Sequence, residues 1–246
     1  IAVGDVDGDG FPDVLAVSDV PEATDEREKR ERGEAPSRAR REPVPAEEDD
    51  GYRRGFNVRA FFGTKDGVFT ESTAGLEDAC YGYALALSPR PADGGAPFFA
   101  TGCRYVGWTN LLYEWDAPAR TFRRAGRGVV ELYSVHTGAA VGTYRGFPAA
   151  FVSYLKTNAP VVLEKPIRGQ GVSIYYREGG EWKRKRVVKD LADRPAESTG
   201  VGVGDLNGDG LDDVVWADDA TGRLRVFFQT RKGDFEELDP ALQPRH

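Results

Sequence analysis

The sequence has no methionine, two histidines and two cysteines among its 246 residues. Histidine and cysteine are the usual ligands of zinc and other transition metals, so their scarcity argues against such a site. No stretch approaches the run of about 18 apolar residues that a membrane-spanning helix needs. The net charge is −7 at pH 7 and there is no basic stripe, which argues against nucleic acid as a partner.

The familiar catalytic motifs are also missing. The chain contains no G-x-S-x-G elbow, no P-loop and no supported Cys–His pair. Gly200-Val-Gly-Val-Gly204 resembles a nucleotide-binding turn, but it does not open a helix as that function requires. We expect a structural or exposed role for His136. The sequence therefore predicts no enzyme, no catalytic residues and no organic cofactor, and a glycosidase-like pair of carboxylates stays open as an alternative.

Two copies of an acidic, glycine-containing nonapeptide are the main feature that the sequence does have. Residues 5–13 read Asp-Val-Asp-Gly-Asp-Gly-Phe-Pro-Asp, and residues 205–213 read Asp-Leu-Asn-Gly-Asp-Gly-Leu-Asp-Asp. Each copy places side-chain oxygens at positions 1, 3, 5 and 9, and Ca²⁺ takes shells of about 6–8 oxygens. The predicted calcium ligands are the side chains of Asp5, Asp7, Asp9 and Asp13 with the carbonyl of Phe11, and the side chains of Asp205, Asn207, Asp209 and Asp213 with the carbonyl of Leu211.

The positions around each nonapeptide separate it from an EF-hand. An EF-hand needs a bidentate Glu at position 12, where this chain has Ala16 and Trp216. Short β-rich runs such as Ile1-Ala-Val3 flank the loops, which favours β-hairpins with sharp turns at Gly10 and Gly210. The alternative is that Asp, Asn and Gly merely form turns. Four carboxyl or amide groups exceed what a turn needs, and unneutralised carboxylates repel one another, so we expect a cation in each loop.

The first copy with its flanks, residues 4–15, resembles the FG-GAP/VCBS repeat of integrin α-subunit propellers and many secreted proteins. The resemblance covers only the beginning of two repeats in this chain. It implies an all-β fold, a β-propeller in which Ca²⁺ lies in a hairpin loop of a blade. It says almost nothing about the activity of the whole protein.

The repeat continues beyond the acidic loop. Residues 57–71 align without a gap with residues 223–237, and both segments contain an aromatic strand, a Gly turn and a Phe-bearing strand. The offset is 166 positions here and 200 at the acidic loops, because the first repeat contains an insertion. The insertion, residues 21–55, is highly charged and poor in apolar residues, so we expect a flexible loop at a rim. That this loop docks a partner is a hypothesis.

Two weaker copies lie between the acidic loops. Their second halves are residues 111–122 and 172–182, and their first halves are residues 83–100 and 149–163. Pro89–Gly95 and Lys156–Pro160 replace the acidic loop there, so we expect those blades to keep their strands and lose the cation. The sequence predicts about four four-stranded blades, near residues 1–80, 81–128, 129–196 and 197–242, in a single propeller domain. Two unrelated β-domains are the alternative.

The N-terminus suggests that blades are missing. The chain starts with Ile1 inside an expected strand and has no methionine, so we expect a fragment or a processed product. Members of the resembling family usually close with more than four blades, which implies a larger ring, such as one of seven blades.

The two cysteines are predicted to form a disulfide bond. If residues 83–88 pair with residues 95–100 across the loop 89–94, the numbers of opposed residues sum to 183, as Cys80 and Cys103 do. Two buried free thiols are the alternative, because hairpin register slips easily. Disulfides form in oxidising compartments, which fits an extracellular, secreted, periplasmic or lumenal location.

These expectations describe a calcium-stabilised extracellular β-propeller scaffold that binds a protein or glycan partner, as in cell adhesion, without catalysis. One alternative is a structural subunit of a larger assembly, in which a neighbour covers an open edge. The other is the non-catalytic propeller part of a carbohydrate-active enzyme.

Overall fold

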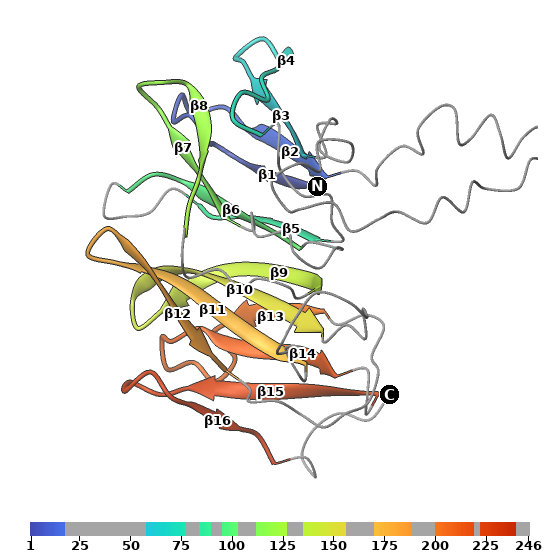
Figure 1. Ribbon diagram of the computed structural model, residues 1–246, viewed down its shortest axis with the longest axis vertical. Coiled ribbons are helices and arrows are strands. Elements are labelled where there is room, and N and C mark those ends of the chain that lie inside the picture. The colour runs from blue at the N-terminus through green and yellow to red at the C-terminus, as the bar shows by residue number, and fades with distance from the viewer. Residues whose placement is uncertain are drawn as a thin grey trace, which may run out of the picture.

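The computed structural model describes residues 1–17, 58–76, 84–89, 95–102, 112–126, 135–155, 170–187, 200–218 and 222–239. For Val135, His136 and Leu155 it describes the backbone alone. All regular elements in these ranges are β-strands, and no helix among them is long and apolar enough to cross a membrane. The strands form four four-stranded antiparallel sheets, which we call blades 1 to 4 in chain order (Figure 1). The predicted all-β fold with about four four-stranded units is confirmed.

Each blade consists of four strands that follow one another in the sequence. Blade 1 contains β1 (Ala2–Gly4), β2 (Asp13–Val17), β3 (Val58–Gly63) and β4 (Phe69–Glu71). Blade 2 contains β5 (Ala84–Leu87), β6 (Phe98–Gly102), β7 (Leu112–Asp116) and β8 (Thr121–Arg124). Blade 3 contains β9 (Val135–Tyr144), β10 (Phe147–Leu155), β11 (Gly171–Glu178) and β12 (Glu181–Arg186). Blade 4 contains β13 (Val201–Gly204), β14 (Asp213–Asp218), β15 (Arg223–Gln229) and β16 (Phe235–Glu237).

The blades pack face to face in a row. Their first strands contact one another in series, β1 with β5, β5 with β9 and β9 with β13. Figure 1 shows blade 1 at one end of the long axis and blade 4 at the other. The described residues therefore show an open row of blades and not a closed ring.

A hydrophobic core fills each of the three junctions between neighbouring blades. Side chains alternate between the two faces of a strand, so one strand can supply two different cores. Phe99 on β6 packs in the core shared with blade 1, and its neighbour Phe98 packs in the core shared with blade 3. Trp216 and Phe151 meet in the core between blades 3 and 4. Each buried aromatic or aliphatic side chain contributes about 1.5–3 kcal/mol, so these three cores stabilise the packing of neighbouring blades on one another.

A buried polar cluster crosses the junction between blades 2 and 3. Glu114 on β7 accepts hydrogen bonds from Arg177 Nη1 and Trp182 Nε1 of blade 3, each at 3.0 Å. Arg123 on β8 lies 3.2 Å from the other oxygen of Glu114. A carboxylate removed from water is costly unless it is paired, and these three donors supply that pairing.

The first two strands of blade 3 lie earlier in the sequence than predicted, although the blade falls within the predicted bounds 129–196. Its first two strands are β9 and β10, joined by a two-residue turn in which Arg145 has a φ of 54° and Gly146 a φ of 80°. Two consecutive positive φ angles match the twist of a tight hairpin. The assignment of 149–163 as the first half was therefore wrong. Arg145-Gly146, and not Lys156–Pro160, stands where blades 1 and 4 have the acidic loop.

The register of the β5–β6 hairpin also differs from the prediction. Ala84 pairs with Gly102 and Leu85 with Thr101, so opposed residue numbers sum to 186 and not to 183. The ladder continues to Ser88, whose N–H donates to the carbonyl of Phe98 at 2.8 Å and whose hydroxyl accepts from the Phe98 N–H at 2.9 Å. The geometric argument for a Cys80–Cys103 bridge is thereby lost. Both cysteines, like the insertion 21–55, lie outside the described residues.

Candidate metal centre

Both acidic nonapeptides connect the first two strands of a blade. Residues 5–12 link β1 to β2, and residues 205–212 link β13 to β14, as antiparallel hairpins. The predicted sharp turns occur at Gly10 and Gly210, with φ angles of 89° and 83°. Gly8 and Gly208, at 81° and 79°, adopt the same left-handed conformation, which the sequence reasoning did not anticipate.

The first loop directs its backbone N–H groups at its own carboxylates. Asp5 accepts from the N–H of Gly8 at 2.6 Å and from that of Gly10 at 3.1 Å. Asp9 accepts from the N–H of Phe11 at 2.8 Å. These local bonds hold the loop in a fixed shape, because they give the loop N–H groups, which have no partner on a neighbouring strand, a carboxylate acceptor instead.

The second loop repeats this hydrogen-bond pattern. Asp205 accepts from Gly208 at 2.7 Å and Gly210 at 3.0 Å, and Asp209 accepts from Leu211 at 2.8 Å. Asn207 replaces the aspartate at position 3, and its amide nitrogen donates to Asp209 at 3.2 Å. The two loops therefore share one hydrogen-bond pattern, while the predicted ligands of the second loop carry one negative charge less than those of the first.

The aspartate at position 9 is a buried clamp in both blades. Asp13 accepts the N–H of Val6 at 2.7 Å and, through its other oxygen, the N–H of Gly63 on β3 at 2.9 Å. Asp213 accepts in the same way from Leu206 at 3.0 Å and from Gln229 on β15 at 2.8 Å. Each carboxylate thus ties the loop to the third strand of its blade. The sequence identified these residues as ligands and missed this second role.

Burial raises the pKa of the Asp13 carboxyl, and the backbone hydrogen bonds from Gly63 and Val6 only partly oppose that shift. The nearby charge of Asp7 acts in the same direction as burial. An additional positive charge beside Asp13 would favour its ionised form.

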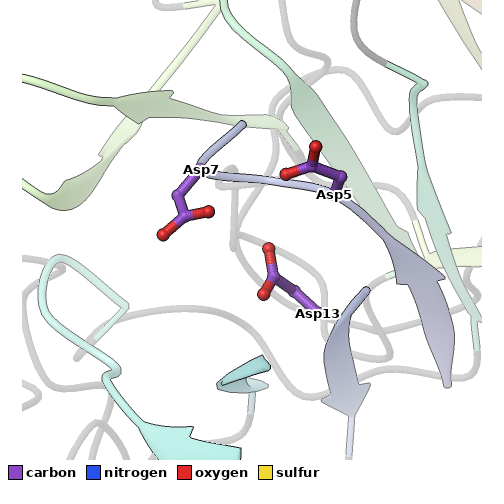
Figure 2. Close-up of side chains that lie close together, drawn as sticks. All are labelled: Asp5, Asp7 and Asp13. Atoms are coloured by element: carbon purple, nitrogen blue, oxygen red, sulfur yellow. The ribbon is translucent and has the colours of Figure 1, made fainter. Parts of the chain in front are cut away.

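Three carboxylates of the first loop converge on one space. The carboxylates of Asp5, Asp7 and Asp13 point toward one space (Figure 2), and each offers an oxygen that lies within 4.8 Å of the other two. Oxygens that bind one Ca²⁺ at about 2.3–2.6 Å lie no more than about 5 Å apart. The set contains only oxygen donors, so it fits a hard cation such as Ca²⁺. Asp9 is not one of the three, and its ligand role stays a prediction, as do the carbonyls of Phe11 and Leu211.

A family comparison agrees with this geometry. The family model of the FG-GAP-like repeat matches residues 205–245, which include the second acidic loop and β14 to β16. The chain carries an FG-GAP-like repeat. Comparison with curated proteins finds no match. The match to residues 205–245 confirms the predicted resemblance to the FG-GAP repeat family, and blade 1 shows the same hydrogen-bond pattern as the acidic loop of the matched repeat.

A run of four basic residues, Lys183 to Arg186, lies on β12, the edge strand of blade 3. Lys183 donates to Glu178 at 2.5 Å, and this bond lowers the pKa of the Glu178 carboxyl. Lys185 donates to Asp234 of blade 4 at 3.0 Å. The run therefore binds its own neighbours and protects an edge strand.

Proposed function

We propose that this protein is a calcium-stabilised β-propeller scaffold of an extracellular, periplasmic or lumenal compartment. It presents rim surfaces to a protein or glycan partner, as in adhesion, and catalyses no reaction. The observation that carries the proposal is the shared geometry of the two acidic hairpin loops, with three carboxylates converging in the first. The FG-GAP-like repeat supports a propeller-like scaffold.

In this proposal the cation acts on the framework of blades 1 and 4. Asp5, Asp7 and Asp13 would hold Ca²⁺ in blade 1, and Asp205, Asn207, Asp209 and Asp213 would hold it in blade 4. Bound Ca²⁺ supplies positive charge that offsets the repulsion among these carboxylates. Because Asp13 and Asp213 also bind the third strand, a rigid loop fixes two hairpins of the blade together.

Calcium removal is the direct test. A cation that binds only the folded protein adds about 2.7 kcal/mol of stability when its concentration is 100 times its dissociation constant. We therefore expect the melting temperature to fall by several degrees when a chelator removes Ca²⁺, and to recover when Ca²⁺ is restored. Differential scanning calorimetry measures both steps. A melting temperature that chelator and Ca²⁺ leave unchanged would refute the calcium proposal.

Matched variants localise the effect. Asp7→Ala combined with Asp209→Ala should abolish the response to Ca²⁺, because each substitution removes a proposed ligand. Both side chains are exposed or half-buried and have few other partners, so the calcium-free fold should be little disturbed. Asp66→Ala, which removes an equally exposed carboxylate in the β3–β4 turn, should leave the response intact. A full calcium response in the double variant would place the cation elsewhere.

The response should also depend on pH. A carboxylate must be ionised to bind a metal, and the raised pKa of Asp13 lets protons compete at a higher pH than at an ordinary aspartate. The stabilisation by Ca²⁺ is thus present above that pKa and lost as the pH falls through it. Measuring the calcium-induced shift in melting temperature at neutral and at mildly acidic pH tests this expectation. An equal shift at both would contradict it.

A structural role in a larger assembly is the second candidate. The large apolar side chains that are exposed among the described residues, Ile1, Val3, Val68, Phe69 and Leu206, all belong to the two end blades of the row.

A further inference from the structure

The second acidic loop and its blade are bound by a neighbouring blade. Two residues at the end of β9, Thr143 and Tyr144, and Arg145 in the turn that follows each donate a hydrogen bond to blade 4. Thr143 donates both its N–H and its hydroxyl to one oxygen of Asp212, at 2.6 and 2.8 Å. Tyr144 donates its hydroxyl to the carbonyl of Gly233 at 2.7 Å. Because β9 is an edge strand of its sheet, its outward N–H finds this partner on the acidic loop.

Gln229 on β15 connects the second loop to the same turn of blade 3. Its buried side chain accepts the N–H of Arg145 at 2.8 Å and donates from its amide nitrogen to the carbonyl of Asp212 at 2.7 Å. Its backbone N–H donates to the buried clamp Asp213 at 2.8 Å. One residue therefore contacts the β9–β10 turn of blade 3 and both residues that end the acidic loop.

The two blades also approach each other closely at this point. A Cβ on Gly142 of β9 would lie 2.8 Å from the Asp212 carboxylate and 2.7 Å from the side chain of Val203 on β13. Neither distance leaves room for a carbon atom, so the absence of a side chain at position 142 lets the loop reach β9. The contact between the second loop and blade 3 is therefore tightly packed as well as hydrogen-bonded.

The first acidic loop has neither of the two side chains that make these contacts. The offset of 200 positions places Pro12 at the position of Asp212, and the offset of 166 places Gly63 at the position of Gln229. Proline has no carboxylate, and glycine has no side-chain amide. A Cβ on Gly63 would lie 2.2 Å from the carbonyl oxygen of Pro12, so no larger residue fits there without a shift. The side-chain contacts of Asp212 and Gln229 therefore have no equivalent at the first loop.

We propose that Gln229 and Asp212 are positioning residues that couple the calcium affinity of the second loop to the packing of blade 3 on blade 4. The inference rests on the proposed function, because it concerns the second of the two proposed calcium sites. A site binds its ligand more tightly when its groups are already held in place, since less ordering is then lost on binding. Asp212 lies between the predicted ligands Leu211 and Asp213, so blade 3 orders the segment that carries both. By reciprocity, a bound cation should stabilise the contact with blade 3 by the same factor.

Calcium titration of the full chain with one loop silenced tests the coupling. Asp7→Ala removes a proposed ligand of the first loop and leaves the second loop intact, whereas Asp209→Ala does the reverse. With the second loop intact, Gln229→Ala should raise the dissociation constant for Ca²⁺ about tenfold, as measured by isothermal titration calorimetry. With the first loop intact, the same substitution should leave the constant unchanged. A side chain that merely stabilised the fold would leave both constants unchanged, and that result would overturn the proposal.

A substitution within blade 3 shows whether the effect crosses the junction. Thr143→Val keeps the shape of the side chain and removes the hydroxyl that donates to Asp212. It should weaken calcium binding by the second loop about fivefold, although it lies in another blade. Thr70→Val, at an exposed threonine of β4, is the matched control and should leave both loops unchanged. A constant that Thr143→Val leaves unchanged would confine the effect to blade 4 and contradict the coupling.

Hydrogen exchange in the unsubstituted chain gives a measurement that needs no variant at the junction. The N–H groups of Thr143 and Arg145 donate to blade 4, so a cation in the second loop should slow their exchange. We expect about tenfold more slowing there than at Ser88, whose N–H donates within blade 2 and reports overall stability. Asp209→Ala should remove this difference. Equal slowing at all three amides, measured by NMR, would reduce the effect to overall stability and refute the coupling.

The calcium proposal and the coupling fail in different measurements. A chain in which neither melting temperature nor titration responds to Ca²⁺ has no calcium site, and the coupling is then refuted as well. A chain that binds Ca²⁺ in the second loop with one constant in every junction variant keeps the calcium-stabilised scaffold and loses the coupling alone. Thermal unfolding in chelator, followed by circular dichroism, verifies that Gln229→Ala and Thr143→Val are folded before their titrations are compared.

Discussion

Replacing Gly75 with alanine is expected to lower the free energy of unfolding by about 4 kcal/mol or more, which places it among the most damaging single substitutions. Gly75 has a φ of 84°, and a Cβ there would lie 1.8 Å from the carbonyl oxygen of Phe122 on β8. The new Cβ and the Phe122 carbonyl oxygen are both held in place by the backbone, so neither can move away as the end of a flexible side chain could. Phe122 donates its N–H to Ala74 at 2.9 Å, and the neighbouring Leu76 is fully buried. The substitution should loosen the junction between blades 1 and 2.

Gly67→Ala is the matched control, because it separates backbone strain from the collision. Gly67 has a similar φ of 73°, but a Cβ there meets no atom within 4 Å. The strain of a left-handed alanine alone should cost about 1–3 kcal/mol. Urea unfolding of both variants measures the difference. Equal losses would mean that the Phe122 carbonyl yields, and would contradict the proposed close packing.

Asp213→Ala is expected to cost about 3–6 kcal/mol even in chelator, since hydrogen bonds to a charged group contribute about 1.5–3 kcal/mol each. Its carboxylate is fully buried and accepts the N–H groups of Leu206 and Gln229. Alanine leaves both donors without their partner. The β13–β14 loop of blade 4 would then lose its connection to β15.

Asp209→Ala provides the comparison for this clamp. Asp209 lies in the same loop but is exposed, and one backbone N–H, that of Leu211, donates to it. In chelator its loss should cost about 1 kcal/mol. With Ca²⁺ both variants should lose calcium-dependent stability. If the two variants were equally stable in chelator, Asp213 would be a cation ligand alone and not a clamp.

The strands of blades 1 and 4 could be predicted from the sequence because the repeat occurs there in two clearly similar copies. The offsets of 200 and 166 positions placed β1 to β4 against β13 to β16, and the acidic loops marked the hairpins. The spacing of the nonapeptide also predicted that Asp5, Asp7 and Asp13 converge, because a short loop limits the directions in which its side chains can point. The clamp was not foreseen, because its partners Gly63 and Gln229 are distant in sequence.

The errors occurred where the repeat had diverged. In blade 3 a two-residue turn between Tyr144 and Phe147 replaces the nine-residue acidic motif, so no loop of comparable length marks the first hairpin in the sequence. In blade 2 the observed register is accompanied by a hydrogen bond from the Phe98 N–H to the Ser88 hydroxyl, which no pattern of alternating residues encodes. Hydrophobic alternation fixes which face a residue takes, but a shift between strands needs the turn geometry.

The turn at Arg145-Gly146 shows that a blade of this chain can close its first hairpin with two residues and no acidic group. Blade 3 therefore closes this hairpin without a cation, whereas the proposed cation sites lie in blades 1 and 4. Without metal, unfolding would begin at both ends of the row and move inward. A falling calcium concentration would then loosen the hairpin loops of blades 1 and 4 before it affects the two-residue turn of blade 3.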